Sequence, residues 1–177
     1  GDSQLIVDFF TEKLGRLSFI VRVPKSSKAK AKRQLFQPLM ILNLEFDYRP
    51  KASLQKMRDA SISVPFVDIP FSPYKLTMSM FLAELLGYAT RAEQQGDALF
   101  HFLMDSILWL DQAESNFSNF HIVFMIKLTA YLGFSPNIES GAGMDYFDLV
   151  DGCFVSAVPT HRNYLDAEDS MRMVHLL

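Results

Sequence analysis

Apolar and polar side chains alternate along the first part of the chain, with the period of two that is typical of β-strands lying on a core. The alternating runs cover residues 4–11, 16–23, 38–48 and 53–63. Between the first two runs Gly15 can take a positive φ, which predicts a hairpin. Short antiparallel strands joined by hairpins indicate a small barrel or a curled sheet. Four strands leave an edge, which a strand before residue 1 would close.

The pattern becomes helical after three prolines, Pro65, Pro70 and Pro73, so a boundary is expected near residues 64–72. Helices are predicted from residue 73 to about 95, over 98–115, over 120–132 and after a cap at Asp166. The sequence therefore predicts an α+β protein with two domains. These are a strand domain at 1–64 and a helical domain at 72–177, and both ends of the chain look incomplete.

One long segment, residues 134–160, interrupts the helical pattern with glycines and prolines. Within it, residues 146–155 are expected to form a hairpin that turns at Asp151-Gly152. The helical domain is thus expected to carry a long loop or hairpin insertion.

Charge is divided unevenly along the chain, although the net charge at pH 7 is only −3. Residues 1–60 hold 12 Lys and Arg against 6 Asp and Glu, whereas residues 61–177 hold 5 against 14. Such a division favours a nucleic-acid or phosphate surface on the first part and a different role for the second. The single cysteine excludes intrachain disulfides and cysteine-rich zinc sites, and fits a reducing cytoplasm. No stretch approaches the roughly 20 apolar residues that span a bilayer, so no membrane partner is expected.

Basic residues are concentrated between Arg16 and Arg33, a stretch without any acidic residue. Arg16 and Arg22 share the polar face of the strand at 16–23, and lysines follow in a Ser/Ala-rich loop. This pattern favours a surface for a polyanion, although it also fits a solvated loop. The candidate phosphate contacts are Arg16, Arg22, Lys25, Lys28, Lys30, Lys32 and Arg33, with Lys51, Lys56 and Arg58 as secondary candidates.

Aromatic residues are interleaved with these cations. Proteins that bind single strands stack bases on such rings, but rings at alternate strand positions more often belong to the core. Phe19 and Phe46 are assigned to the core, and Phe36 is the candidate for base stacking.

Groups that could carry catalysis do not form a known pattern. Asp145, Asp148 and Asp151 are spaced by three and raise the question of a divalent metal, but Asp151-Gly152 is also an ordinary turn. The four histidines form no H-x-x-x-H pair, and none is placed to activate Cys153. The sequence has no P-loop, G-x-S-x-G or H-E-x-x-H motif. It therefore predicts no catalytic site, no metal and no other cofactor.

The chain resembles the family of the bacterial recombination mediator RecO over its whole length. Several segments carry this resemblance through their order and spacing. They are GDSQLIVDFFTEKLGRLSFIV at 1–21, LFQPLMILNLEF at 35–46, FLAELL at 81–86, LTAYLGFSP at 128–136 and YFDLVDGCF at 146–154.

The resemblance implies an N-terminal OB-fold barrel followed by a helical domain, in a protein without an enzyme's active site. It implies binding to single- and double-stranded DNA, annealing of complementary strands, and a location in the cytoplasm at the nucleoid. RecO-like proteins act with RecR to load RecA onto DNA covered by single-strand-binding protein, and they bind that protein's acidic, hydrophobic C-terminal tail. In this family the first strand would precede Gly1 and the helical domain would continue beyond Leu177. Some members carry a four-cysteine zinc site after the LGF segment, but residues 137–149 (NIESGAGMDYFDL) contain no cysteine, so zinc is not carried over.

Three functions follow from these observations. The leading hypothesis is a DNA-binding, strand-annealing mediator. The second is a protein-interaction adaptor whose helical domain docks a partner's tail without direct DNA contact. The third is a metal-dependent nuclease that uses the aspartates between residues 145 and 151.

Overall fold

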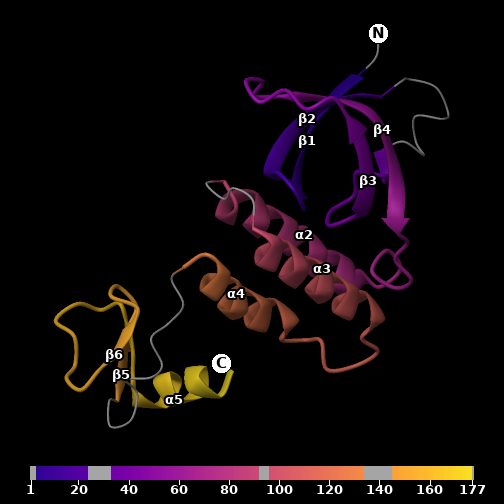
Figure 1. Ribbon diagram of the computed structural model, residues 1–177. Helices are drawn as coiled ribbons and strands as arrows, with labels where there is room; N and C mark the ends of the chain where they lie inside the picture. Colours follow the sequence, from indigo (N-terminus) through magenta and orange to yellow (C-terminus); the bar gives the residue numbers. More distant parts are fainter. Residues whose placement is uncertain (1–2, 24–32, 92–95, 134–144, 177) are drawn as a thin grey trace. The chain divides into compact units, whose positions relative to one another are not determined.

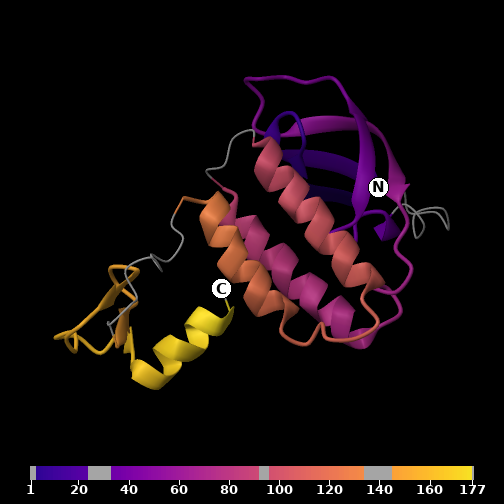
Figure 2. The same ribbon diagram turned by 60° about the horizontal axis from the view of Figure 1, so that its bottom comes forward.

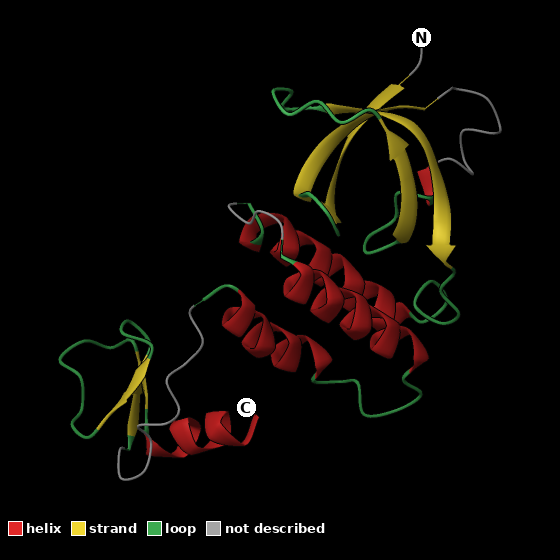
Figure 3. Ribbon diagram, in the orientation of Figure 1, coloured by secondary structure: helices red, strands yellow, loops and turns green. Residues whose placement is uncertain are grey.

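A computed structural model describes residues 3–23, 33–91, 96–133 and 145–176 (Figure 1). The strands of the first part are followed by helices, which confirms the predicted α+β class (Figure 3). The change from strands to helices falls between Val64 and Pro73. The chain divides into two compact units, residues 1–117 and 118–177, and each is described by itself.

The first two strands, β1 (Ser3–Thr11) and β2 (Gly15–Val23), form the predicted antiparallel hairpin. The turn is tight because Gly15 has a φ of 64°, a conformation that side chains rarely adopt. The Thr11 hydroxyl donates to the Gly15 carbonyl at 2.8 Å and accepts the Leu14 amide at 3.2 Å, which closes the turn.

The next two strands, β3 (Ile41–Phe46) and β4 (Gln55–Val64), form a second antiparallel hairpin with an irregular register. The hairpins are joined by a short parallel pairing of β2 with β4, at Phe19 opposite Gln55 and Ile20 opposite Lys56. The strand order is therefore β1-β2-β4-β3. The sheet curls, but among the described residues it stays open between β1 and β3, so a closed barrel is not confirmed (Figure 1).

The inner face of the sheet carries the core that the alternation predicted. Phe19 is fully buried and Val21 nearly so. The ring of Phe19 meets those of Phe9 and Phe46 edge to face, with centroids 5.4 and 4.8 Å apart. The partly buried residues packed on this core are Leu5, Val7, Phe9, Leu17, Phe36, Leu44, Phe46 and Met57.

Two helices complete the first unit, α2 (Pro73–Ala89) and α3 (Asp97–Gln112), and they lie side by side in both views (Figures 1 and 2). The Ser72 hydroxyl caps α2, and Pro73 occupies its first position, where proline is favoured. The prediction that this helix continues to about residue 95 is wrong, because α2 ends at Ala89. The Thr90 amide and hydroxyl both donate to the Leu86 carbonyl and close the last turn.

A buried polar cluster ties α2 and α3 to the segment after β4. The Asp111 carboxylate on α3 accepts the amides of Val67, Asp68 and Ile69 at 2.8–3.0 Å. The Lys75 side chain is only 1% exposed; its ammonium lies 2.7 Å from the Asp68 carboxylate and donates to the Asp111 carbonyl at 3.0 Å. Every charged group in this cluster therefore has a partner, which buried charges require.

The second unit contains α4 (Phe120–Tyr131), a small sheet and α5 (Ala167–Leu176). Its strands are β5 (Tyr146–Asp148), β6 (Cys153–Val155) and β7 (Tyr164–Leu165), in the order β6-β5-β7. The β5–β6 hairpin confirms the predicted insertion, whereas β7 was not predicted. Apart from the insertion this part was expected to be all-helical, and β7 shows that this expectation is too simple. The Ser170 hydroxyl of α5 connects β5 and β7 to that helix. That hydroxyl accepts the Phe147 amide and donates to the Leu165 carbonyl.

Among the helices that the structure describes, none has both the length and the apolar character needed to cross a membrane.

Candidate nucleic-acid interface

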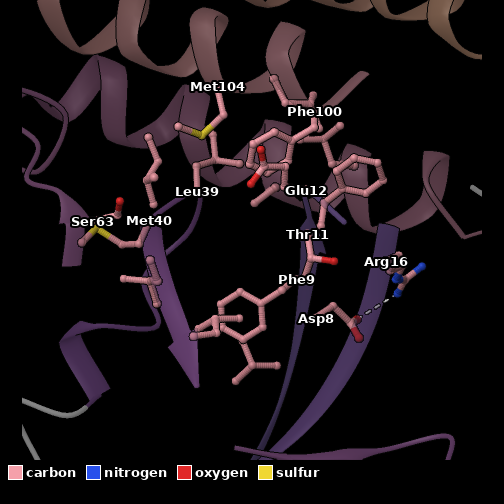
Figure 4. A pocket seen from close by; sticks show the side chains of 18 of the residues that line it. Asp8, Phe9, Thr11, Glu12, Arg16, Leu39, Met40, Ser63, Phe100 and Met104 are labelled. Atoms are coloured by element: carbon pink, nitrogen blue, oxygen red, sulfur yellow. Dashed lines mark hydrogen bonds and ion pairs between the residues drawn. The ribbon is translucent and has the colours of Figure 1, made fainter. Parts of the chain in front are cut away.

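A cavity of about 820 Å³ in the first unit lies where the sheet is open. Figure 4 shows Phe9 and Thr11 of β1 on one side, Leu39 and Met40 before β3 on the other, and Met104 of α3 at the helical end. Consecutive residues of both edge strands line it, so the backbone edges border the cavity rather than one face of each strand. In a sheet such edges carry amides and carbonyls without a strand partner.

Two of the charged groups at this cavity, Arg16 and Asp8, pair with each other. Arg16 is 18% exposed; its guanidinium pairs with the Asp8 carboxylate at 2.8 Å and donates to the Gly87 carbonyl at 2.8 Å (Figure 4). The Ser18 hydroxyl also donates to Asp8. Burial alone would raise the pKa of Asp8, but the Ser18 hydrogen bond and the Arg16 charge lower it. Arg16 therefore joins β2 to α2, and its charge is largely neutralised by Asp8.

Three predicted DNA contacts come together where β2 and β4 part. A groove of about 350 Å³ runs between β2 and β4, and Arg22, Lys56 and Arg58 all line it. Arg22 belongs to β2 and the other two to β4, and all three are exposed. They converge because β2 and β4 are parallel neighbours, with Ile20 directly opposite Lys56. The parallel pairing thus builds a basic surface from residues far apart in the sequence.

Acidic groups reduce the positive charge of this surface near Arg58. Asp59 also lines the groove, and Arg58 forms an exposed ion pair with Asp47 at the end of β3. Exposed pairs of this kind are worth little and are easily exchanged for another anion. The side of the groove formed by Arg22 and Lys56 is therefore its more basic part.

The remaining predicted contacts fall elsewhere. Lys25, Lys28, Lys30 and Lys32 lie outside the described residues, and Arg33 and Lys51 are exposed. Phe36, predicted to stack on a base, packs with its ring centroid 6.3 Å from that of Phe9 and belongs to the inner core group. Core packing accounts for this ring without a nucleic acid.

The aspartates of the second unit do not assemble a metal site. Asp145 and Asp151 are exposed, whereas the buried Asp148 carboxylate accepts the amides of Val150 and Asp151 and lies 3.1 Å from the His161 ring. Within the described ranges, no group of three His, Cys, Asp or Glu residues could hold a metal ion. Turn formation therefore explains Asp148, and nothing in these ranges supports the nuclease hypothesis.

Two family models match the chain, and both describe recombination protein O. The model of its N-terminal part matches residues 1–66 and that of its C-terminal part residues 70–146. "DNA repair protein RecO" of Bacteroides fragilis is 42% identical over 178 residues, covering 100% of this chain and 74% of the relative. The proteins of that name from Phocaeicola vulgatus and Flavobacterium johnsoniae are 42% and 38% identical, covering 98% and 86% of this chain and 72% and 64% of the relatives. The chain belongs to the RecO family.

The charge pattern of the sequence predicts the cations of the groove, but it does not show that Ile20 and Met57 also line it. Nor does it show that Asp8 pairs with Arg16. The register of the β1–β2 hairpin, which sets Asp8 opposite Ser18, was the signal available for that pairing.

Proposed function

We propose that this chain acts in DNA repair and recombination as a mediator that binds single- and double-stranded DNA and anneals complementary strands. The observation that carries this proposal is the convergence of Arg22, Lys56 and Arg58 on one groove between β2 and β4. Membership of the RecO family supports it independently. By the same family likeness, the chain acts with RecR to load RecA onto DNA covered by single-strand-binding protein.

The proposed activity needs no covalent chemistry, so we also propose that the chain is not an enzyme. Phosphate contacts release counterions, and annealing follows when two strands are held on a surface that neutralises their mutual repulsion. Cations and flexible single strands are sufficient for this.

The sheet itself supports a finer proposal, that the first domain is an OB-type barrel in which a further strand lies between β1 and β3. The order β1-β2-β4-β3, the parallel β2–β4 pairing and the cavity along both free edges support it. Amide hydrogen exchange tests this in a version extended before Gly1 by a strand of alternating apolar residues. The edge amides of β1 and β3 should become protected, and unchanged exchange would refute the barrel.

The main test is a fluorescence-anisotropy titration of a labelled single strand at several salt concentrations. Three or four phosphate contacts give a slope of about −2 to −3 for log K against log salt. Replacing Arg22 and Lys56 by Gln should reduce the magnitude of that slope by about 1.4, for every DNA sequence alike.

Lys13→Gln is the matched control, because Lys13 is an exposed cation in the β1–β2 turn, at the other end of the hairpin from Arg22. Strand geometry separates the two by roughly 25 Å. Binding that is absent, independent of salt, or equally weakened by Lys13→Gln would contradict the proposal.

A protein-interaction adaptor remains the second candidate, favoured by apolar side chains on α2. Tyr74, Phe81 and Tyr88 recur every seventh residue along the helix and are 75%, 43% and 62% exposed. Such a patch is typical of a surface that docks a partner. Under this hypothesis the C-terminal tail of single-strand-binding protein binds here, and tail-peptide binding survives the Arg22 and Lys56 substitutions while DNA binding is absent throughout.

A further inference from the structure

The groove between β2 and β4 is lined by apolar as well as basic side chains. The two strands pair directly at only two positions, and beyond Ile20 and Lys56 the groove opens between them. Val21 and Met57 line it there, and both belong to the inner core group. The groove therefore reaches down to the core layer, while Arg22 and Lys56 stand at its sides.

This combination selects among anionic ligands. A simple anion or a duplex backbone needs only the cations, since a duplex keeps its bases paired and stacked inside. A single strand offers phosphates together with unstacked bases, whose faces are apolar. A groove that has cations beside an apolar floor therefore fits a single strand better than a duplex.

We propose that this groove admits a nucleobase of single-stranded DNA, while Arg22 and Lys56 hold the flanking phosphates, so that the chain prefers single strands over duplex. The inference rests on the DNA binding proposed above and adds that the groove distinguishes single strands from duplex. Ile20, half-buried at the point where the strands part, contacts the face of the base. Because the described residues that line the groove include no aromatic ring, the contact is made by aliphatic groups and carries little preference among the four bases.

The test compares two isoleucines on the same outer face. Ile20 lines the groove, whereas Ile6 lies directly across the β1–β2 ladder, is 68% exposed and does not line it. Each is replaced by Ala in the full chain. Binding is measured by anisotropy with a single strand of about 16 nucleotides, with a duplex of that length, and with a strand of that length that lacks bases.

Ile20→Ala should weaken binding to the single strand roughly three- to tenfold, because part of one aliphatic side chain is lost from the contact. Binding to the duplex should stay unchanged, and Ile6→Ala should alter neither. The strand without bases should bind the unaltered chain more weakly than the ordinary strand. Ile20→Val, which removes only one methyl group, should give a smaller loss in the same direction if the Ala variant does not fold.

Other outcomes overturn the inference. If Ile20→Ala weakens single-strand and duplex binding equally, or if Ile6→Ala has the same effect, the groove does not select bases. If the strand without bases binds as tightly as the ordinary one, no base enters the groove. If the unaltered chain binds neither single strand nor duplex, the proposed function itself fails, which is a result distinct from these.

Discussion

Replacing Asp111 by Asn should destabilise the first unit, although the new side chain has nearly the same shape and size. The carboxylate holds three consecutive amides, those of Val67, Asp68 and Ile69, and thereby fixes the segment that leads from β4 into α2. One oxygen accepts two of these amides and the other accepts one. An Asn side chain can keep the first oxygen, but its NH₂ group then faces the Val67 amide, donor against donor.

The expected loss in the free energy of unfolding follows from these three hydrogen bonds. Two hydrogen bonds change from charge-assisted to neutral, each weaker by about 1 kcal/mol, and the part-buried Val67 amide loses its acceptor, which costs about 1–3 kcal/mol. The sum is roughly 3–5 kcal/mol. For a chain of this size that corresponds to a fall in Tm of about 6–20 °C.

The assay is thermal unfolding followed by circular dichroism at several pH values. Asp105→Asn is the matched control, because Asp105 is an exposed carboxylate on the same helix. Burial alone would raise the pKa of Asp111, but the three amides and the Lys75 charge lower it below its ordinary value of 3.8. The stabilisation by Asp111 is therefore fully present above the unfolded-state pKa and is lost as pH falls through the lowered folded-state value.

Two results would refute this reasoning. An Asp111→Asn variant as stable as the Asp105→Asn control at pH 7 would mean that the amide contacts contribute little. A difference in Tm between the Asp111→Asn variant and the unaltered chain that stays constant down to strongly acidic pH would mean that it does not depend on the charge.

Two more substitutions test other parts of the structure. Phe19→Leu should lower the free energy of unfolding by about 1–3 kcal/mol, because it removes both edge-to-face contacts from a fully buried site, and urea unfolding measures it. The exposed Phe71→Leu should have almost no effect, and equal losses would contradict the core assignment. Asp148→Ala should open the β5–β6 turn, seen as faster hydrogen exchange of the Val150 and Asp151 amides. Burial alone would raise the pKa of Asp148, but these amides and His161 lower it, so acid should have the same effect in the unaltered chain.

The strand faces could be predicted because a period of two needs only local information. Phe19 and Val21 fall on the buried face that alternation gave them, and Arg22 falls on the outer one. The hairpin turns followed for the same reason, since Gly15 and Gly152 both have a positive φ.

Other features depend on tertiary contacts that leave little trace in the sequence. The strand β7 has only two residues, which is too short for any periodicity to be visible in the sequence. It is a strand because it pairs with Phe147 and Asp148 of β5. Lys75 resembles an ordinary surface lysine on a helix, and only the nearby Asp68 and Asp111 make its burial tolerable. Helix α2 ends at Ala89 without a glycine at its C-cap, which is Thr90, so the sequence carries no clear stop signal there.

The cations of the groove could be predicted from the sequence, but the strand pairing that brings them together could not. Charge pattern identified Arg22, Lys56 and Arg58, since a basic stripe on a strand is visible without a partner strand. That β4 lies beside β2, and parallel to it, is a topological fact that neither strand encodes alone.

The short parallel junction between β2 and β4 also bears on how the sheet assembles. Each hairpin closes locally, whereas Phe19 meets Gln55 only after a loop of roughly 36 residues has been closed, at an entropic cost of about 3 kcal/mol. Folding of this sheet is therefore expected to begin in the two hairpins and to be limited by their docking at Phe19 and Ile20. Because the basic groove lies at that junction, it exists only once the slowest contact of the sheet has formed, and a partly folded chain would display its cations without the groove.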